Sequence, residues 1–168
     1  MDAKDILLDL YGRLPDAVHA AVDGLDESAL SARLDESANS IAWLVWHLTR
    51  VQDDHVSEVA GHEQTWTAEG WASRFGLPFD EAETGYGFSS EQVGQVRASA
   101  GLLTGYHDAV HARTVAYLQG LTDDDLDRVV DEDWDPPVTL GVRLVSVADD
   151  DLEHVAQAAY VRGVLERR

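Results

Sequence analysis

The chain has 168 residues, of which 45% are hydrophobic, and its 32 acidic and 12 basic residues give a formal charge of −20 at neutral pH. This size and composition predict one globular domain spanning 1–168, and the charge argues against nucleic acid or an anionic membrane as partner. The absence of cysteine excludes disulfides and thiolate ligands, and because neither a membrane-length apolar run nor a signal peptide is present, we expect a soluble, cytoplasmic protein.

Four long helical patterns follow one another along the chain. The first runs from Ala3 to Val22, where apolar residues recur every three or four positions and Pro15 is expected to bend the helix. Asn39 or Ser40 then caps a second helix, which is predicted to end at Gly61.

A long crossover from Gly61 to Ser89 separates the second helix from the third. We expect it to cover one end of the molecule and to contain one short helix. A capping box over Ser89–Gln92 opens the third helix, which is predicted to continue to about Gly120. The fourth helix begins at Thr139 or Leu140 and runs almost to the end of the chain. With no sustained strand alternation, the pattern predicts an all-α four-helix bundle with a long crossover between helices 2 and 3.

Helical bundles build their sites from polar residues on inward faces, so inward histidines and acids are the first candidates. His47 lies on the apolar stripe of the second helix, one turn before Val51. Asp150 and His154 are four residues apart in the fourth helix, so their side chains share one face, which we expect to point inward. Three neighbouring acids are expected to face solvent: Asp149, Asp151 and Glu153.

Two interpretations of Asp150 and His154 stay open on spacing alone. The pair is consistent with an ordinary hydrogen bond within one helix. Together with His47 it is also consistent with a metal site of two imidazoles and one carboxylate, a set that suits Zn, Ni or Fe(II). His47 by itself is equally consistent with a hydrogen-bonded core histidine.

Other polar residues are weaker candidates. His107 and His111 are also spaced by four and could clamp a metal, but they lie at the edge of an apolar stripe, so we expect them to be structural or to line a cleft. Asp54 is a candidate outer partner that accepts the second N–H of a metal-bound imidazole. Three further histidines are expected at the surface: His19, His55 and His62.

Three segments resemble the DinB-like superfamily of metal-dependent bundle proteins, and in particular the subgroup related to mycothiol-dependent maleylpyruvate isomerases and thiol transferases. They are NSIAWLVWHLTRVQDDH, FGLPFDEAETGYGFSSEQVGQVR and DPPVTLGVRLVSVADDDLEHVAQAAYVRG. Together they cover most of the chain from Asn39 onward.

The resemblance implies a set of metal ligands. In that superfamily one histidine comes from the second helix, and an H-x-x-x-H pair followed by x-x-Q comes from the fourth. His47 matches the first position, and His154 with Gln157 matches the end of the second motif. The first histidine of the pair falls on Asp150, a departure from the commonest pattern, although a carboxylate can replace imidazole as a ligand. The implied cofactor is a divalent metal: Zn, Ni or Fe.

The resemblance also implies a function, a metal-dependent transferase or isomerase that uses a low-molecular-weight thiol such as mycothiol as cosubstrate. The expected partners are a small-molecule substrate, that thiol and, in a homodimer, a second copy of the chain. The alternative is a non-catalytic bundle that binds a metal or small ligand through a degenerate site, which the aspartate at position 150 keeps open.

Overall fold

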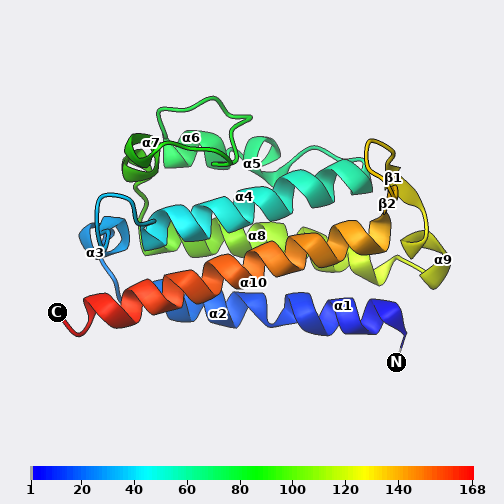
Figure 1. The fold of residues 1–168 in the computed structure, drawn as a ribbon, viewed down its shortest axis with the longest axis horizontal. Helices are drawn as coiled ribbons and strands as arrows, with labels where there is room; N and C mark the ends of the chain where they lie inside the picture. The colour runs from blue at the N-terminus through cyan, green and yellow to red at the C-terminus, as the bar shows by residue number, and fades with distance from the viewer. Residues whose placement is uncertain (1) are drawn as a thin grey trace.

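The computed structural model describes residues 2–168 and is 65% helix and 3% strand, which confirms the predicted all-α class. Helices α4, α8 and α10 and the in-line pair α1–α2 run side by side as a bundle (Figure 1). The elements in chain order are α1 (Ala3–Gly12), α2 (Leu14–Val22), α3 (Glu27–Ser31), α4 (Ile41–Ala60), α5 (Thr65–Ala68), α6 (Trp71–Phe75), α7 (Ser90–Gln95), α8 (Ala100–Gln119), α9 (Asp123–Leu126), β1 (Val129–Asp131), β2 (Val138–Thr139) and α10 (Leu140–Leu165).

The two helices that carry the candidate residues begin and end where local chemistry dictates. The Ser40 side chain accepts a hydrogen bond from the Trp43 amide and so caps α4, which ends at Gly61 with a φ of 73°. The Thr139 side chain caps α10 in the same way by accepting from the Val142 amide. The predicted starts of both helices are therefore confirmed.

The first and third predicted helices are each divided. The first breaks at Arg13, two residues before Pro15, as the proline predicts. The third was predicted as one helix, and this is wrong, because α7 ends at Gln95 and the chain is extended at Val96 before α8 begins. Ser99 explains the interruption, since it adopts the extended backbone of an N-cap and its side chain accepts from the amide three residues later.

The crossover lies along the flank of α4, above it in Figure 1, and does not cover one end of the bundle as predicted. It contains two short helices, α5 and α6, where one was expected. Aromatic side chains attach these helices to α8, since the rings of Trp66, Trp71 and Phe75 all lie within 6 Å of the Tyr106 ring. This packing fixes the crossover over the part of α4 that carries His47.

Two short antiparallel strands that the sequence pattern did not predict precede α10. β1 pairs with β2 through Val129↔Thr139 and Asp131↔Val138, with an irregularity between the two pairs. Strands of three and two residues are too short to show alternation, so their absence from the prediction is expected. Within residues 2–168, no helix is long and apolar enough to cross a membrane.

The buried stripe of α10 corrects the predicted facing of its acids. It passes through Leu144, Val147, Asp151, Val155 and Ala158. Asp151 was predicted to face solvent but is fully buried, because α10 packs against α2 as well as against α4 and its buried sector is therefore wide. Asp150 and His154 lie one position to the side of this stripe and are partly exposed, so they sit at the edge between core and solvent.

Candidate metal centre

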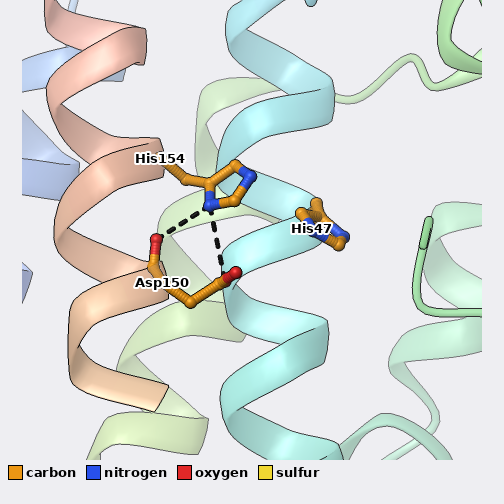
Figure 2. Close-up of side chains that lie close together, drawn as sticks. All are labelled: His47, Asp150 and His154. Atoms are coloured by element: carbon orange, nitrogen blue, oxygen red, sulfur yellow. Dashed lines mark hydrogen bonds and ion pairs between the residues drawn. The ribbon is translucent and has the colours of Figure 1, made fainter. Parts of the chain in front are cut away.

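The structure brings His47, Asp150 and His154 together across the α4–α10 interface (Figure 2). Each side chain offers one ligand atom, and these atoms all lie within 4.8 Å of one another. Within residues 2–168 this is the one group of three or more histidines and acids so arranged. The packing of α4 against α10 therefore places the three residues in one location, as the metal interpretation requires.

His47 is held in one orientation by the crossover and by its own helix. Its Nδ1 lies 2.6 Å from the Thr84 carbonyl oxygen, and because a carbonyl only accepts, Nδ1 carries the proton. The ring is stacked on Trp43 with centroids 4.5 Å apart and planes 15° from parallel. The unprotonated Nε2 is left free and is available as a ligand atom.

His154 is oriented in the same way by the preceding turn of α10. Its Nδ1 donates to the Asp150 carbonyl oxygen at 2.8 Å and lies 3.4 Å from the Asp150 carboxylate (Figure 2). The proton therefore resides on Nδ1 in the neutral ring, and Nε2 is again free. The two imidazoles approach edge to face, with centroids 4.8 Å apart.

The Asp150 carboxylate supplies the test of whether these residues fit a metal. Its Oδ2 is buried and accepts no hydrogen bond from the described residues, and its one ion-pair contact is a long one, 3.4 Å to His154 Nδ1. A buried carboxylate oxygen without a partner is costly, and a bound cation is one way to satisfy it. Two free imidazole nitrogens and one carboxylate oxygen that accepts no hydrogen bond form a donor set that suits a divalent transition metal.

The two imidazoles differ in their affinity for protons. Burial lowers the pKa of His47, an effect that the Thr84 hydrogen bond only partly offsets and the neighbouring His154 reinforces. Burial also lowers the pKa of His154, but its hydrogen bonds and its attraction to Asp150 outweigh burial, so that pKa ends above the ordinary value. His47 is therefore neutral and ready to bind at neutral pH, whereas a metal at His154 competes with a more tightly held proton.

The centre opens onto a groove formed by three cavities that share lining residues. The first, of about 460 Å³, is lined by Thr84, His55 and Asp150 among others. A second, of about 370 Å³, extends from Asp150 to Trp134 in the β1–β2 loop. A third, of about 760 Å³, continues past His55 toward Glu58 at the end of α4. Of the three candidate ligands, Asp150 lines the first two cavities, so a molecule in the groove can reach its carboxylate from solvent.

His55 and Arg143 are groove residues that the sequence reasoning missed. His55 was expected at the surface, yet it is half-buried and lines all three cavities. The Arg143 guanidinium is 3.2 Å from His55 Nδ1 and pairs with Glu58 and Asp131. Because arginine only donates, His55 Nδ1 accepts, and in the neutral ring the proton is on Nε2. The eight-residue spacing from His47, two turns on the same face of α4, was the available signal.

The outer partners differ from those predicted. Asp54 lines the groove but accepts a hydrogen bond from Gln64 at 2.6 Å, and the acceptor that holds His47 is Thr84. Gln157 is exposed, and no hydrogen bond joins it to the three candidate ligands. Thr84 acts through its backbone carbonyl, which every residue possesses, so side-chain identity gives no signal for this role.

The remaining histidines lie elsewhere. His107 is fully buried and His111 half-buried on α8, and neither lines the three cavities of the groove. His62 is exposed, as predicted, and His19 is partly exposed and contacts Asp108.

Comparisons with known proteins indicate the family of the chain and a solved structure of similar fold. The family model described as mycothiol-S-transferase matches residues 8–167. A crystal structure of a conserved protein from Enterococcus faecalis is similar over 100% of this chain and 99% of that chain, with a TM-score of 0.92 and 28% sequence identity. No curated protein matches the sequence.

Proposed function

The chain belongs to the mycothiol-S-transferase family, and we propose that it is a divalent-metal-dependent enzyme that transfers a low-molecular-weight thiol such as mycothiol to a small electrophile. The observation that carries the proposal is the convergence of His47, His154 and the Asp150 carboxylate, whose Oδ2 accepts no hydrogen bond and which lines the groove. The family match favours thiol transfer over the isomerase alternative.

The proposed ligands are His47 Nε2, His154 Nε2 and the Asp150 carboxylate. When bound, a divalent ion supplies Lewis-acid chemistry, since it lowers the pKa of a thiol and polarises the electrophile. Thr84 and the Asp150 carbonyl orient the two rings, which removes the cost of ordering them when the metal binds.

The thiol has to come from outside, because the chain contains no cysteine. The groove supports this requirement, since it leads from solvent to Asp150 and offers hydrogen-bonding side chains along its length. Acids outnumber bases in its lining, where Asp54, Glu58 and Asp131 are present and Arg143 already pairs with two of them. A neutral or cationic electrophile therefore suits the groove better than a dicarboxylate.

Thiol transfer to a fluorogenic halide tests the proposal directly. Metal-stripped protein is reloaded with Zn²⁺, Ni²⁺ or Fe²⁺ and mixed with mycothiol and monochlorobimane, where a C–S bond forms, a C–Cl bond breaks, chloride leaves and the thiol proton passes to solvent. We expect turnover above the uncatalysed rate with at least one metal, loss of turnover on chelation, and loss in His154→Ala.

Two other outcomes have separate meanings. Stoichiometric metal binding without turnover of mycothiol, with several electrophiles, would support the non-catalytic metal-binding alternative. Wild-type protein that binds none of the three metals would contradict the proposed centre itself.

A further inference from the structure

The crossover passes unusually close to His47. Thr84 places its carbonyl oxygen 2.6 Å from His47 Nδ1, and the next residue, Gly85, has a φ of +94°. A Cβ at position 85 would lie 2.9 Å from Trp46 Cζ3, 3.0 Å from His47 Nδ1 and 3.3 Å from Trp43 Nε1. Any side chain at this position would therefore have to displace the loop, the imidazole or both.

Gly87 in the same loop provides a contrast. Its φ is +73°, so it too occupies a backbone conformation that favours glycine, but a Cβ there would have nothing within 4 Å. An alanine would thus strain the backbone at both positions, but its Cβ would contact the imidazole only at position 85.

Buried Arg50 anchors the other end of this loop. Its guanidinium is fully buried and donates to the carbonyl oxygens of Glu81 and Glu83 at 3.4 and 3.2 Å, and to Gln64 Oε1 at 2.7 Å. Arg50 follows His47 by about one helical turn on α4. The helix that carries the imidazole therefore also holds the crossover segment whose Thr84 carbonyl orients that imidazole.

We propose that Gly85 is a positioning residue for the metal centre. Its missing side chain allows the Arg50-anchored crossover to approach His47 closely enough for the Thr84 carbonyl to fix the imidazole with its proton on Nδ1 and Nε2 facing the ion. The proposal rests on His47 being a ligand, as proposed above. Trp43, stacked on one face of the ring, adds a second contact that holds the imidazole in place.

The test compares Gly85→Ala with Gly87→Ala in the full-length protein. Three measurements are made on metal-stripped samples: Co²⁺ and Zn²⁺ titration against a chromophoric chelator, long-range ¹⁵N–¹H correlation of the His47 ring at a pH where it is neutral, and thermal unfolding. We expect Gly85→Ala to lose roughly 10–100-fold in affinity for both metals, as for loss of an outer partner, and to lose the single Nδ1–H tautomer of His47. Gly87→Ala should be destabilised by its backbone but keep the tautomer and, within threefold, the affinity.

Each outcome bears on the proposal. Wild-type affinity and an unchanged His47 tautomer in Gly85→Ala would overturn it, as would equal losses in the two variants. If Gly85→Ala does not fold, the wild-type spectrum still decides, because a His47 ring with its proton on Nε2 contradicts the proposed positioning. Arg50→Lys, which removes the two carbonyl anchors and keeps the charge, should then show the same loss of tautomer. If Gly85 fixes the tautomer but the protein binds no metal, the proposed function is wrong, and the role of Gly85 in orienting the His47 ring still holds.

Discussion

Two pairs of histidines lie in this bundle, and only one of them has the features of a site. His47 and His154, here called the groove pair because the adjacent Asp150 lines the groove, approach edge to face, and each is held by a carbonyl that leaves Nε2 free. His107 and His111 lie on α8 with parallel rings 6.0 Å apart. His107 is more deeply buried than either groove histidine, yet neither of its nitrogens has a hydrogen-bond partner among the described residues.

The comparison shows that hydrogen-bond partners and a convergent third ligand, more than burial, distinguish a candidate ligand from a core histidine. Asp108 is the carboxylate nearest His107, but it lies 3.8 Å from Nδ1 and is engaged by His19 at 3.0 Å. Among residues 2–168 no hydrogen bond fixes the His107 tautomer, and His107 and His111 belong to no convergent group of three ligand atoms. Burial without a partner lowers the pKa of His107 to about 4, with the nearby His111 adding to the effect, which keeps the ring neutral.

The largest expected effect follows from removing a ligand from the groove pair. His47→Ala or His154→Ala should reduce Zn²⁺ affinity by more than the roughly 10–100-fold that loss of an outer partner costs. His111→Ala is the matched control, because it removes a histidine of the same spacing from α8 and should leave affinity and stoichiometry unchanged. Metal analysis after gel filtration, with competition titration, measures both. An equal loss of Zn²⁺ affinity in His111→Ala and in the groove variants would contradict the distinction between the two pairs.

The second effect concerns the pH dependence of folding and belongs to the α8 pair. His107 has a folded pKa of about 4 against roughly 6.5 when unfolded, so the unfolded chain binds more protons between these values. The contribution of His107 to stability is complete above about pH 6.5 and is lost as pH falls toward 4, by on the order of 3 kcal/mol. In urea unfolding of the metal-free proteins, the free energy of unfolding of wild type should therefore fall relative to that of His107→Leu as the pH is lowered from about 6.5 toward 4. A difference that does not vary with pH would contradict it.

A third effect separates the two adjacent acids of α10. Asp150→Asn should weaken Zn²⁺ binding by about 10-fold or more, because an amide oxygen is a poorer ligand than a carboxylate. Asp151→Asn and Asp149→Asn should change it far less, since neither residue belongs to the convergent set. Competition titration with a chromophoric chelator compares the three. A loss at Asp151 as large as at Asp150 would show that the assignment of the ligand is wrong.

Asp151→Asn also carries a stability signature of its own. Burial, reinforced by the charge of Asp150, raises the pKa of the fully buried Asp151 carboxyl well above its ordinary value, so the folded state keeps a proton that the unfolded state loses. This lowers wild-type stability as pH rises above about 4. The stabilisation by Asp151→Asn should thus grow with pH, opposite in sign to the His107 effect, in urea unfolding of the metal-free proteins.

The sequence was sufficient for whatever depends on local chemistry and spacing. Caps at Ser40 and Thr139 define the starts of the two helices, and the four-residue spacing of Asp150 and His154 fixes their shared face. It failed at Asp151, because the width of a buried sector depends on how many helices pack against it. It also failed at the Ser99 cap, where a helical apolar pattern continued through a break in the backbone.

The outer parts of the site depend on tertiary contacts that sequence spacing does not encode. Thr84 reaches His47 through a backbone carbonyl that lies 37 residues away in the chain. Arg143 reaches His55 across 88 residues. Such contacts come from the path of the crossover and of the β1–β2 segment, which have no periodicity to guide a prediction.

The smallest expected effect concerns His55, whose tautomer is the reverse of that of the groove pair. Its Nδ1 accepts from Arg143, so the proton on Nε2 is available to a substrate in the groove. Asparagine can replace the Nδ1 acceptor but not the Nε2 donor, and glutamine can replace the donor but not the acceptor. If His55 binds substrate, His55→Asn should raise KM for the thiol or the electrophile roughly 3–10-fold, the value of one hydrogen bond. His55→Gln should keep a KM close to that of wild type, and the Zn²⁺ affinity should be unchanged in both variants. The opposite ranking would mean that His55 serves to hold Arg143 against Glu58 and Asp131, and that the donors and acceptors which select the substrate lie elsewhere in the groove.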